Sequence, residues 1–275
     1  MSGTGGDQTR APADLTPSHS RGFCDLGNPR SLFKVIQLSD CHVPAAAGTP
    51  YRGMDARATL EALLPVINAW APDLVLATGD LSEDGSAEAY DWLAKALAGL
   101  HAPLLVTPGN HDDAALMASR FEQLAHEQAL VFDASWRVIV LNSAVAGEVT
   151  GRISKAQLAQ LDAALEDSSR PVLVALHHQP QPVGSPWIDR FPLLDPELLL
   201  ARLRAAPQVK VVLWGHVHQA ISLSLNGPLG LGAPSTVSNS LPGEDRFTPD
   251  PAGPAVRWLE LAPDGEVTTG LLRAS

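Results

Sequence analysis

The segment FKVIQLSDCH, residues 33–42, decides the fold, because an apolar run of buried-strand composition leads almost directly into Asp40 and His42. Short runs rich in Val, Ile and Leu are typical of strands that are buried on both faces. The same pattern, an apolar run that ends in Asp, Asn or His, recurs further along the chain. The later segments are LVLATGD (74–80), LLVTPGNHD (104–112), VLVALHH (172–178) and VKVVLWGHVH (209–218). The sequence therefore predicts five strands that each deliver polar side chains at the carboxyl end.

The segments between these runs predict helices, because their apolar residues recur at three- and four-residue spacing. The expected helices are 55–70, 86–100, 113–125, 154–166 and 196–205, and a further strand is expected at 138–142. Pro65 should kink or shorten the first helix. The alternation of strand and helix favours an α/β fold with much parallel sheet. Residues 221–272, with turns at Asn226-Gly227 and Asp264-Gly265, instead predict an antiparallel meander that continues the same body.

Length and composition exclude several classes of protein. A chain of 275 residues that is 45% hydrophobic can bury a sizeable core without disulfides. Residues 1–30 show no apolar periodicity and no signal-peptide core, so we expect a flexible arm followed by one domain over residues 31–275. No stretch approaches the length of a membrane span. The net charge of -11 argues against nucleic-acid polymers and anionic membranes as partners, and the two cysteines favour a reducing, cytoplasmic location.

The residues at the strand ends have the chemistry of metal ligands. In open α/β sheets, ligands bind at the carboxyl edge of the strands, and six of the nine histidines fall in these segments. A mixed Asp, Asn and His set suits Zn, Mn or Fe and lacks the thiolates of a structural zinc site. Because the set is too large for one tetrahedral ion, it suits two ions that share a bridging carboxylate. Gly79, Gly109 and Gly215 stand just before ligands, where a small residue lets the backbone turn sharply.

Together the five blocks resemble the signature of the calcineurin-like metallophosphoesterase superfamily, over about residues 32–272. The blocks are D-x-H at Asp40 and His42, G-D ending at Asp80, G-N-H-D over 109–112, His177, and G-H-x-H over 215–218. The flanking segments, such as VIQLSD (35–40) and SPWID (185–189), are most similar to bacterial class III 3′,5′-cyclic AMP phosphodiesterases. The resemblance implies a four-layer αββα sandwich, in which two mixed sheets pack face to face with helices outside.

The resemblance also implies a role for each matching residue. The first ion would be held by Asp40, His42 and His218, the second ion by Asn110, His177 and His216, and Asp80 would bridge both. His111, paired with Asp112, would be the general acid beside the leaving-group oxygen. Neighbours on a strand point to opposite faces, and we take His177 as the ligand because it aligns with the family's histidine. The residues expected to contact substrate are His42, Asp80, Asn110, His111, His178 and His218.

The resemblance implies that this chain is a hydrolase of small phosphodiesters. The expected reaction is hydrolysis of 3′,5′-cyclic AMP to 5′-AMP, with attack on phosphorus by a hydroxide that bridges two divalent ions. Iron or manganese is expected, with zinc also compatible. The alternatives are other small diesters, such as glycerophosphodiesters or other cyclic nucleotides, and a non-catalytic scaffold. DNA as substrate is disfavoured by the negative charge, and the sequence makes no prediction of oligomeric state.

Four further features of the sequence carry expectations of their own. Cys41 should pack in the core rather than act in redox chemistry. Glu83-Asp84 should be a solvated helix start with Ser86 as its cap. Trp187 and Phe191, in the loop 180–192, either contact a nucleobase or plug the space beneath their loop. Gln179 departs from the family pattern, which puts the shape of that loop in doubt.

Overall fold

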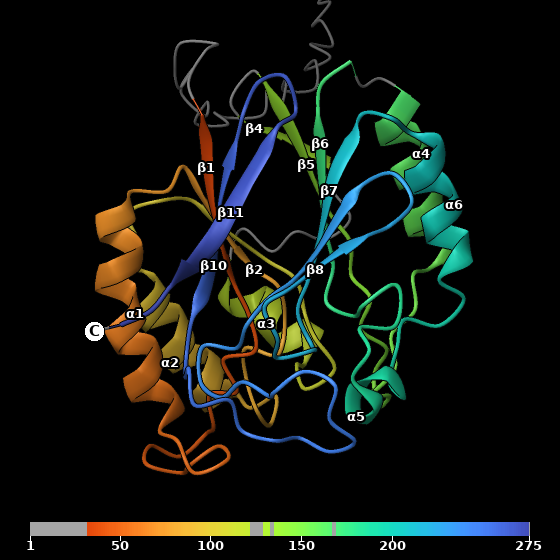
Figure 1. The fold of residues 1–275 in the computed structure, drawn as a ribbon. Coiled ribbons are helices and arrows are strands. Elements are labelled where there is room, and N and C mark those ends of the chain that lie inside the picture. Colours follow the sequence, from red (N-terminus) through yellow and green to blue (C-terminus); the bar gives the residue numbers. More distant parts are fainter. Residues whose placement is uncertain (1–31, 122–128, 133–134, 167–168, 275) are drawn as a thin grey trace, which may run out of the picture.

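A computed structural model describes residues 32–121, 129–132, 135–166 and 169–274. Two mixed sheets pack face to face, and helices cover the outer face of each (Figure 1). The first sheet, in the order β11-β10-β1-β2-β3, contains β1 (Phe33–Leu38), β2 (Leu74–Ala77), β3 (Leu104–Val106), β10 (Val256–Leu261) and β11 (Val267–Leu272). The second sheet, in the order β4-β5-β6-β7-β9-β8, contains β4 (Ala129–Phe132), β5 (Trp136–Val140), β6 (Val172–Ala175), β7 (Val209–Trp214), β8 (Ile221–Ser224) and β9 (Leu229–Gly232). The four-layer sandwich expected from the family resemblance is confirmed.

Three apolar layers hold the sandwich together. The middle layer lies between the sheets, where Val35 and Leu76 of one sheet share a cluster with Val138 and Leu173 of the other. One outer layer packs the first sheet against α1 (Ala56–Trp70) and α2 (Ala87–Leu97). The other packs the second sheet against α4 (Lys155–Glu166) and α6 (Glu197–Ala205). Each central strand is thus buried on both faces, which is why its sequence is a nearly continuous apolar run.

The helices begin where capping residues satisfy their first N–H groups. Asp55 accepts hydrogen bonds from two N–H groups at the start of α1, and Ser86 caps α2 as predicted. Asp113 caps α3 (Ala114–Arg120). The predicted shortening of the first helix is wrong, since α1 runs through Pro65 to Trp70. Pro65 and Glu61 are exposed, so water can bind the Glu61 carbonyl that proline leaves without a helical donor.

The C-terminal quarter differs from the predicted meander. The β8–β9 hairpin joins the second sheet, where β9 lies parallel to β7, whereas the β10–β11 hairpin joins the first sheet beside β1. Two consecutive hairpins thus end in different sheets, and tertiary packing decides which sheet each one joins. β4 was not predicted. The flexible arm expected at residues 1–30 lies outside the described residues, as does the predicted end of the third helix.

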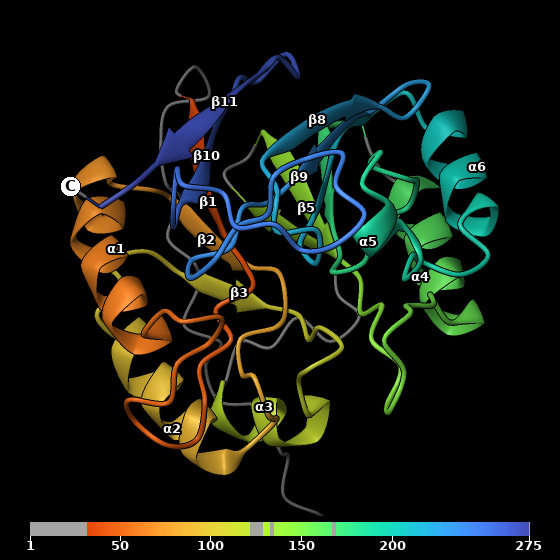
Figure 2. The same ribbon diagram turned by 60° about the horizontal axis from the view of Figure 1, so that its bottom comes forward.

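The loops at one end of the sandwich come forward in Figure 2, beneath the carboxyl ends of β1, β2, β3, β6 and β7. α5 (Pro186–Asp189) lies among them. Because both sheets deliver strand ends to this edge, their polar residues meet there. None of the helices described is long and apolar enough to cross a membrane.

Candidate metal centre

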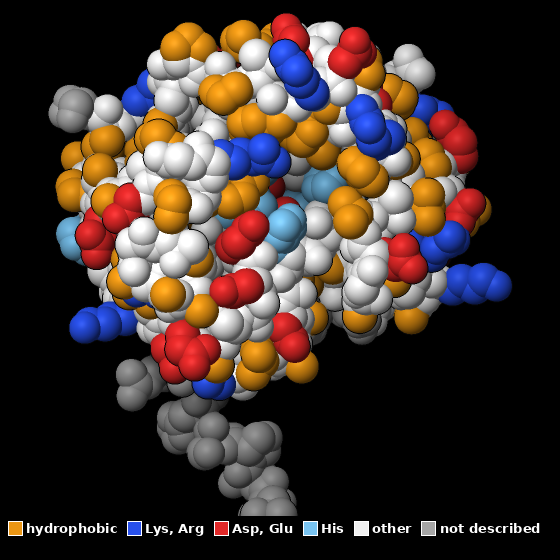
Figure 3. Space-filling model, turned by 90° about the horizontal axis from the view of Figure 1, so that it is seen from below, with side chains coloured by type: hydrophobic (Ala, Val, Ile, Leu, Met, Phe, Trp, Pro, Cys, Tyr) orange, Lys and Arg blue, Asp and Glu red, His pale blue; other side chains and the backbone are white. Residues whose placement is uncertain are grey.

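The predicted ligands converge in a hollow at this end of the molecule, where histidine side chains form the floor (Figure 3). All of them follow strand ends: Asp40 and His42 come after β1, Asp80 after β2, Asn110 after β3, His177 after β6, and His216 and His218 after β7. The first sheet supplies four of these ligands and the second supplies three. The structure therefore brings the two sheets' contributions into one cluster.

One group of possible ligand atoms comes from Asp40, His42 and His218, which are all buried. The Nε2 atom of His42 lies 3.1 Å from Nε2 of His218, and that atom lies 3.5 Å from Oδ1 of Asp40. Two neutral ring nitrogens this close have no proton to share once their other nitrogens are protonated, so a cation between them removes the conflict. This is the group expected to hold the first ion.

Asp80 joins this group to a second one. Its Oδ2 atom lies 3.9 Å from Nε2 of His42 and 3.4 Å from Nε2 of His177, so one carboxylate faces both groups. Nε2 of His177 also lies 3.3 Å from Oδ1 of Asn110. The rings of His177 and His216 have centroids 5.1 Å apart. The sequence resemblance implies that Asp80 bridges two ions, and its carboxylate lies between the two groups.

Each of the four ligand histidines has one nitrogen committed to the protein, which leaves the other for a metal. A hydrogen bond of this kind fixes the tautomer and orients the ring of a metal ligand. The committed atoms are Nδ1 of His42 with Glu83 Oε2 at 2.7 Å, Nδ1 of His177 with the Thr78 carbonyl at 2.8 Å, Nε2 of His216 with the Phe191 carbonyl at 3.0 Å, and Nδ1 of His218 with the Ser238 carbonyl at 2.7 Å. The rings are therefore preorganised for coordination.

The charges of the cluster are incomplete without cations. Burial raises the pKa of Asp40 to about 7. Burial also acts to raise the pKa of Asp80, but the charges of His177 and His42 outweigh it and hold that pKa well below its usual range. Histidines, rather than Lys or Arg, stand beside both carboxylates. Buried carboxylates that are not paired with fixed charges are costly unless they coordinate metals, so this donor set fits divalent ions.

Backbone strain is concentrated at the same residues. Five proposed ligands adopt the left-handed region that side chains disfavour, namely Asp40 (φ 53°), His42 (45°), Asp80 (49°), His216 (67°) and His218 (51°). Such positions cluster at functional sites, where the surrounding structure enforces them. The expectation that small residues precede the ligands is also confirmed. A Cβ on Gly109 would lie 2.2 Å from Oδ1 of Asp80, and one on Gly79 would lie 2.4 Å from Nδ1 of His177.

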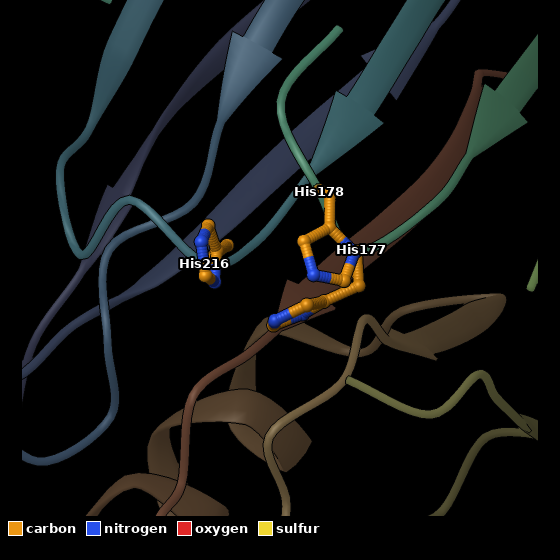
Figure 4. Close-up of side chains that lie close together, drawn as sticks. All are labelled: His177, His178 and His216. Carbon is orange, nitrogen blue, oxygen red and sulfur yellow. The ribbon is translucent and has the colours of Figure 1, made fainter. Parts of the chain in front are cut away.

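His178 does not occupy the position expected of a substrate contact. Its ring lies close to those of His177 and His216 (Figure 4), but both of its nitrogens have partners within the protein. Nδ1 lies 2.8 Å from Oγ of Ser143, and Nε2 lies 3.1 Å from the Val149 carbonyl. Ser143 can donate to Nδ1 while Nε2 donates to the carbonyl, so a neutral His178 is fully satisfied. The geometry favours a structural role.

The partner expected for His111 is also different. The carboxylate of Asp112 does not orient the ring of His111; instead it accepts hydrogen bonds from surrounding backbone and from Tyr90. Those donors are the N–H groups of Leu81, Ser82 and Gly109 and the Tyr90 hydroxyl. Nδ1 of His111 lies 2.9 Å from the backbone carbonyl of Glu83 and 3.3 Å from its Oε2 atom.

Glu83 is therefore part of the centre, and the expectation of a solvated helix start is wrong for it. Its carboxylate contacts both His42 and His111, although it remains about one-third exposed. An acidic residue before a helix cap has the same local pattern whether it is solvated or not, so the sequence carried no signal for this role. Asp84 does form part of the helix start, since it accepts from Ser86.

Aromatic side chains and an arginine border the side of the hollow next to the first-ion group. The ring of Tyr51 stacks on His42 with centroids 4.1 Å apart, and Arg52 lies over the ring of Phe247 at 3.7 Å. Trp187 contacts Phe247 edge-on and lies 6.4 Å from His218. Sequence reasoning named Trp187 but missed the other members of this wall.

The structure also places the other residues that the sequence singled out. Phe191 contributes its backbone carbonyl, which pairs with His216. Gln179 is buried and donates to the Ile188 carbonyl, which ties the loop to α5. Cys41 is buried within the apolar layer between the first sheet and its helices, which confirms its packing role, and burial raises the pKa of its thiol.

Comparisons with known proteins agree with this geometry. The 3′,5′-cyclic adenosine monophosphate phosphodiesterase CpdA of Pseudomonas aeruginosa is 39% identical over 243 residues, covering 87% of this chain and 89% of the relative. The enzyme of the same name from Escherichia coli K12 is 35% identical over 247 residues, with the same coverage. A dimetal phosphatase from Danio rerio has the same fold, with a TM-score of 0.64 and 17% identity over 89% of this chain and all of that one.

Residues 33–220 match the calcineurin-like phosphoesterase family. That range contains every proposed ligand, including both histidines of the G-H-x-H block that follows β7. With the sandwich, the donor clusters and this match in agreement, the chain belongs to the calcineurin-like phosphoesterase family.

Proposed function

We propose that the chain hydrolyses 3′,5′-cyclic AMP to 5′-AMP at this centre, with two divalent ions of iron or manganese, zinc being compatible. The observation that carries the proposal is Asp80, whose carboxylate faces both ligand groups in a buried Asp, Asn and His cluster. The substrate is supported by relatives named as cyclic AMP phosphodiesterases, which share most of their length with this chain.

Bound divalent ions would hold phosphate oxygens, acidify a coordinated water and offset the negative charge that develops on phosphorus. The chain would hold the ions through Asp40, His42 and His218 on one side and Asn110, His177 and His216 on the other, with Asp80 between the two groups. Hydrogen bonds from the rings to Glu83 and to backbone carbonyls, together with strained backbone positions, keep these donors in place without rearrangement.

His111 is the proposed general acid. Because Nδ1 is committed to Glu83, the other ring nitrogen is available to protonate the departing ribose 3′ oxygen. Burial acts to lower the pKa of His111, but the charges of Asp80 and Glu83 outweigh it and raise that pKa. The shift is in the direction that favours the cationic form that a general acid needs, and Glu83 replaces Asp112 as the residue that orients the ring.

The hollow also limits what the substrate contacts. His42, Asp80, Asn110, His111 and His218 lie together and are the proposed contacts for the phosphate end of a small diester. His178 is left out of this proposal because its nitrogens are occupied. A cytoplasmic location remains part of the proposal, in keeping with a cyclic nucleotide as substrate.

A second candidate is the same chemistry on other cyclic nucleotides. A 3′,5′-cyclic-nucleotide phosphodiesterase of Nostoc, whose name does not specify the base, is 34% identical over 250 residues, or 90% of this chain. A non-catalytic scaffold is opposed by the complete ligand set.

The test compares cyclic AMP, cyclic GMP, an aryl phosphodiester and a glycerophosphodiester as substrates of purified protein reconstituted with manganese or iron. We expect cyclic AMP to give the highest kcat/KM. The Asp80→Ala variant is the inactive control, which shows that turnover comes from this centre. Efficient turnover of the aryl diester with negligible hydrolysis of cyclic AMP would overturn the substrate assignment while leaving the family assignment in place.

A further inference from the structure

Arg52 occupies a turn position that arginine disfavours. Tyr51 and Met54 exchange two backbone hydrogen bonds of 2.9 Å each, so Arg52 and Gly53 are the central residues of a two-residue turn. Both have positive φ, at 48° and 83°. Asn-Gly and Gly-Gly are the usual pairs in such turns. Strained backbone positions cluster at functional sites, so an arginine held in this conformation indicates a functional role for its side chain.

The guanidinium of Arg52 is held as a flat surface. Its Nε donates to the Tyr51 hydroxyl at 3.1 Å, and its Cζ lies 3.7 Å from the ring centroid of Phe247. Among the residues that the structure describes, neither terminal nitrogen of Arg52 has a hydrogen-bond acceptor. The side chain is exposed. Its guanidinium rests on Phe247, and the ring centroid of Tyr51 lies 5.3 Å from Cζ, so the exposed remainder of the plane can contact a ligand.

This surface stands beside the first-ion group. Tyr51, which holds Arg52, stacks on His42 with ring planes 4° apart. Phe247, which supports the guanidinium, lies 5.9 Å from the ring of His218. Lysine and arginine side chains are visible near the rim of the hollow in Figure 3. A diester whose phosphate lies at the ligands can therefore place a substituent against Arg52.

The His111 side of the centre offers a different environment. A groove of about 500 Å³ lies there, and apart from Asn110 and His111 it is lined by acidic and small residues such as Asp113 and Val145. Stacking on a guanidinium or an aromatic ring stabilises a flat nucleobase, whereas small aliphatic and acidic side chains do not. Of the two sides, the one with Arg52 and Phe247 suits a base.

We propose that Arg52 favours nucleotides over diesters that lack a base, by stacking its guanidinium on the nucleobase with Phe247 behind it. The proposal rests on the proposed function, since it concerns the base of the cyclic nucleotide. Arg52 makes no contact with the reacting atoms in this scheme; it contributes binding energy to the part of the substrate remote from phosphorus.

The Arg52→Asn variant tests this without breaking the turn, because Asn-Gly is a preferred pair at these positions. We expect KM for cyclic AMP to rise about tenfold while kcat stays within about threefold. Inhibition by two ligands, measured with an aryl diester as reporter substrate, isolates the base. The Ki of 5′-AMP should rise about tenfold, and that of ribose 5-phosphate, which lacks the base, should not change.

Three variants act as controls. Arg52→Lys keeps the charge but not the plane, and it should behave like Arg52→Asn; recovery of wild-type Ki for 5′-AMP would show a charge effect and overturn stacking. Arg152→Ala removes an exposed arginine that pairs with Asp195, and it should change neither Ki. Val145→Ala alters the groove beside His111; a selective rise in the Ki of 5′-AMP in this variant would place the base in that groove and overturn the proposal.

Failure of this proposal can be told from failure of the proposed function. If the wild-type enzyme turns over the aryl diester but not cyclic AMP, the function is wrong, while the two Ki values still decide the role of Arg52. If cyclic AMP is hydrolysed and Arg52→Asn leaves the ratio of the two Ki values unchanged, only the role of Arg52 is wrong.

Discussion

The carboxylate of Glu83 lies 2.7 Å from Nδ1 of His42, on the side of the ring opposite the nitrogen that faces the first-ion group. This pairing of a carboxylate with a ligand histidine fixes the tautomer and raises the basicity of the coordinating nitrogen. Glu83 also reaches His111, so one side chain supports a ligand and the proposed general acid.

Replacing Glu83 with Ala should weaken binding of the first ion by about 10- to 100-fold, the usual cost of losing such a partner. The affinity is measured by calorimetric titration of the metal-free protein with manganese. Glu88→Ala removes an exposed acid from the first turn of α2 and is the matched control. Wild-type affinity for both ions in Glu83→Ala would show that the hydrogen bond to His42 does not support coordination.

Replacing Asp80 with Ala should remove both ions and nearly all activity, because one carboxylate faces both ligand groups. Metal content per chain, measured by elemental analysis after dialysis, is the readout. Asp91→Ala, which removes an exposed acid that pairs with Arg120, should retain full metal content. Two ions per chain in Asp80→Ala would refute the bridging role.

Replacing His111 with Ala should lower kcat by about 10²- to 10⁴-fold, the range for loss of a general acid, at unchanged metal content. A substrate with a good leaving group needs little protonation, so the loss should be smaller for an aryl diester. An equal loss for both substrates would argue against proton donation by His111.

The Asp112→Asn variant tests whether Asp112 takes part in proton donation by His111. The NH₂ group of the asparagine side chain would face the backbone N–H groups and the Tyr90 hydroxyl that now donate to the carboxylate. Each group left unsatisfied should lower the free energy of unfolding by about 1–3 kcal/mol. We expect a lower Tm but a kcat, per folded molecule, much nearer to wild type than that of His111→Ala.

Replacing His178 with Ala should lower the Tm and leave the KM for cyclic AMP unchanged, because its hydrogen bonds to Ser143 and Val149 are structural. Loss of those partners should cost about 1–3 kcal/mol of unfolding free energy. The adjacent His177→Ala variant provides the contrast, since it should lose the second ion. A raised KM with an unchanged Tm in His178→Ala would instead restore the sequence-based expectation of a substrate contact.

Chelation should lower the Tm, because the native cluster binds cations that the unfolded chain does not hold in the same geometry. Each ion present at about 100 times its Kd contributes about 2.7 kcal/mol. Differential scanning calorimetry with and without EDTA measures the change, and added manganese should reverse it. The Asp80→Ala protein should show no response to EDTA, which makes it the control for non-specific effects.

The sequence could predict that the proposed ligands lie together because each one follows a buried strand, and strand and following residue are local in sequence. It did not predict which sheet each strand joins. The hairpins at 221–232 and 256–272 both show the local pattern of two strands joined by a tight turn, and their sheets are set by packing against β7 or β1. Local pattern cannot carry that information, because it depends on residues far away in the chain.

The supporting residues were harder to predict than the ligands for the same reason. Asp112 was expected to hold His111 because the two are adjacent, yet adjacency along a loop does not determine where side chains point. Glu83 reaches His111 from another loop, and Arg52 meets Phe247 from a distant part of the chain. These contacts exist only after the sheets have packed.

The proposed ligands of the first ion follow β1 and β7, and those of the second follow β3, β6 and β7, so neither set lies on a single sheet. A folding intermediate with only one sheet formed would offer an incomplete coordination shell. Metal uptake should therefore be a late event in folding. Once bound, the ions would link the two sheets of the sandwich and stabilise their packing.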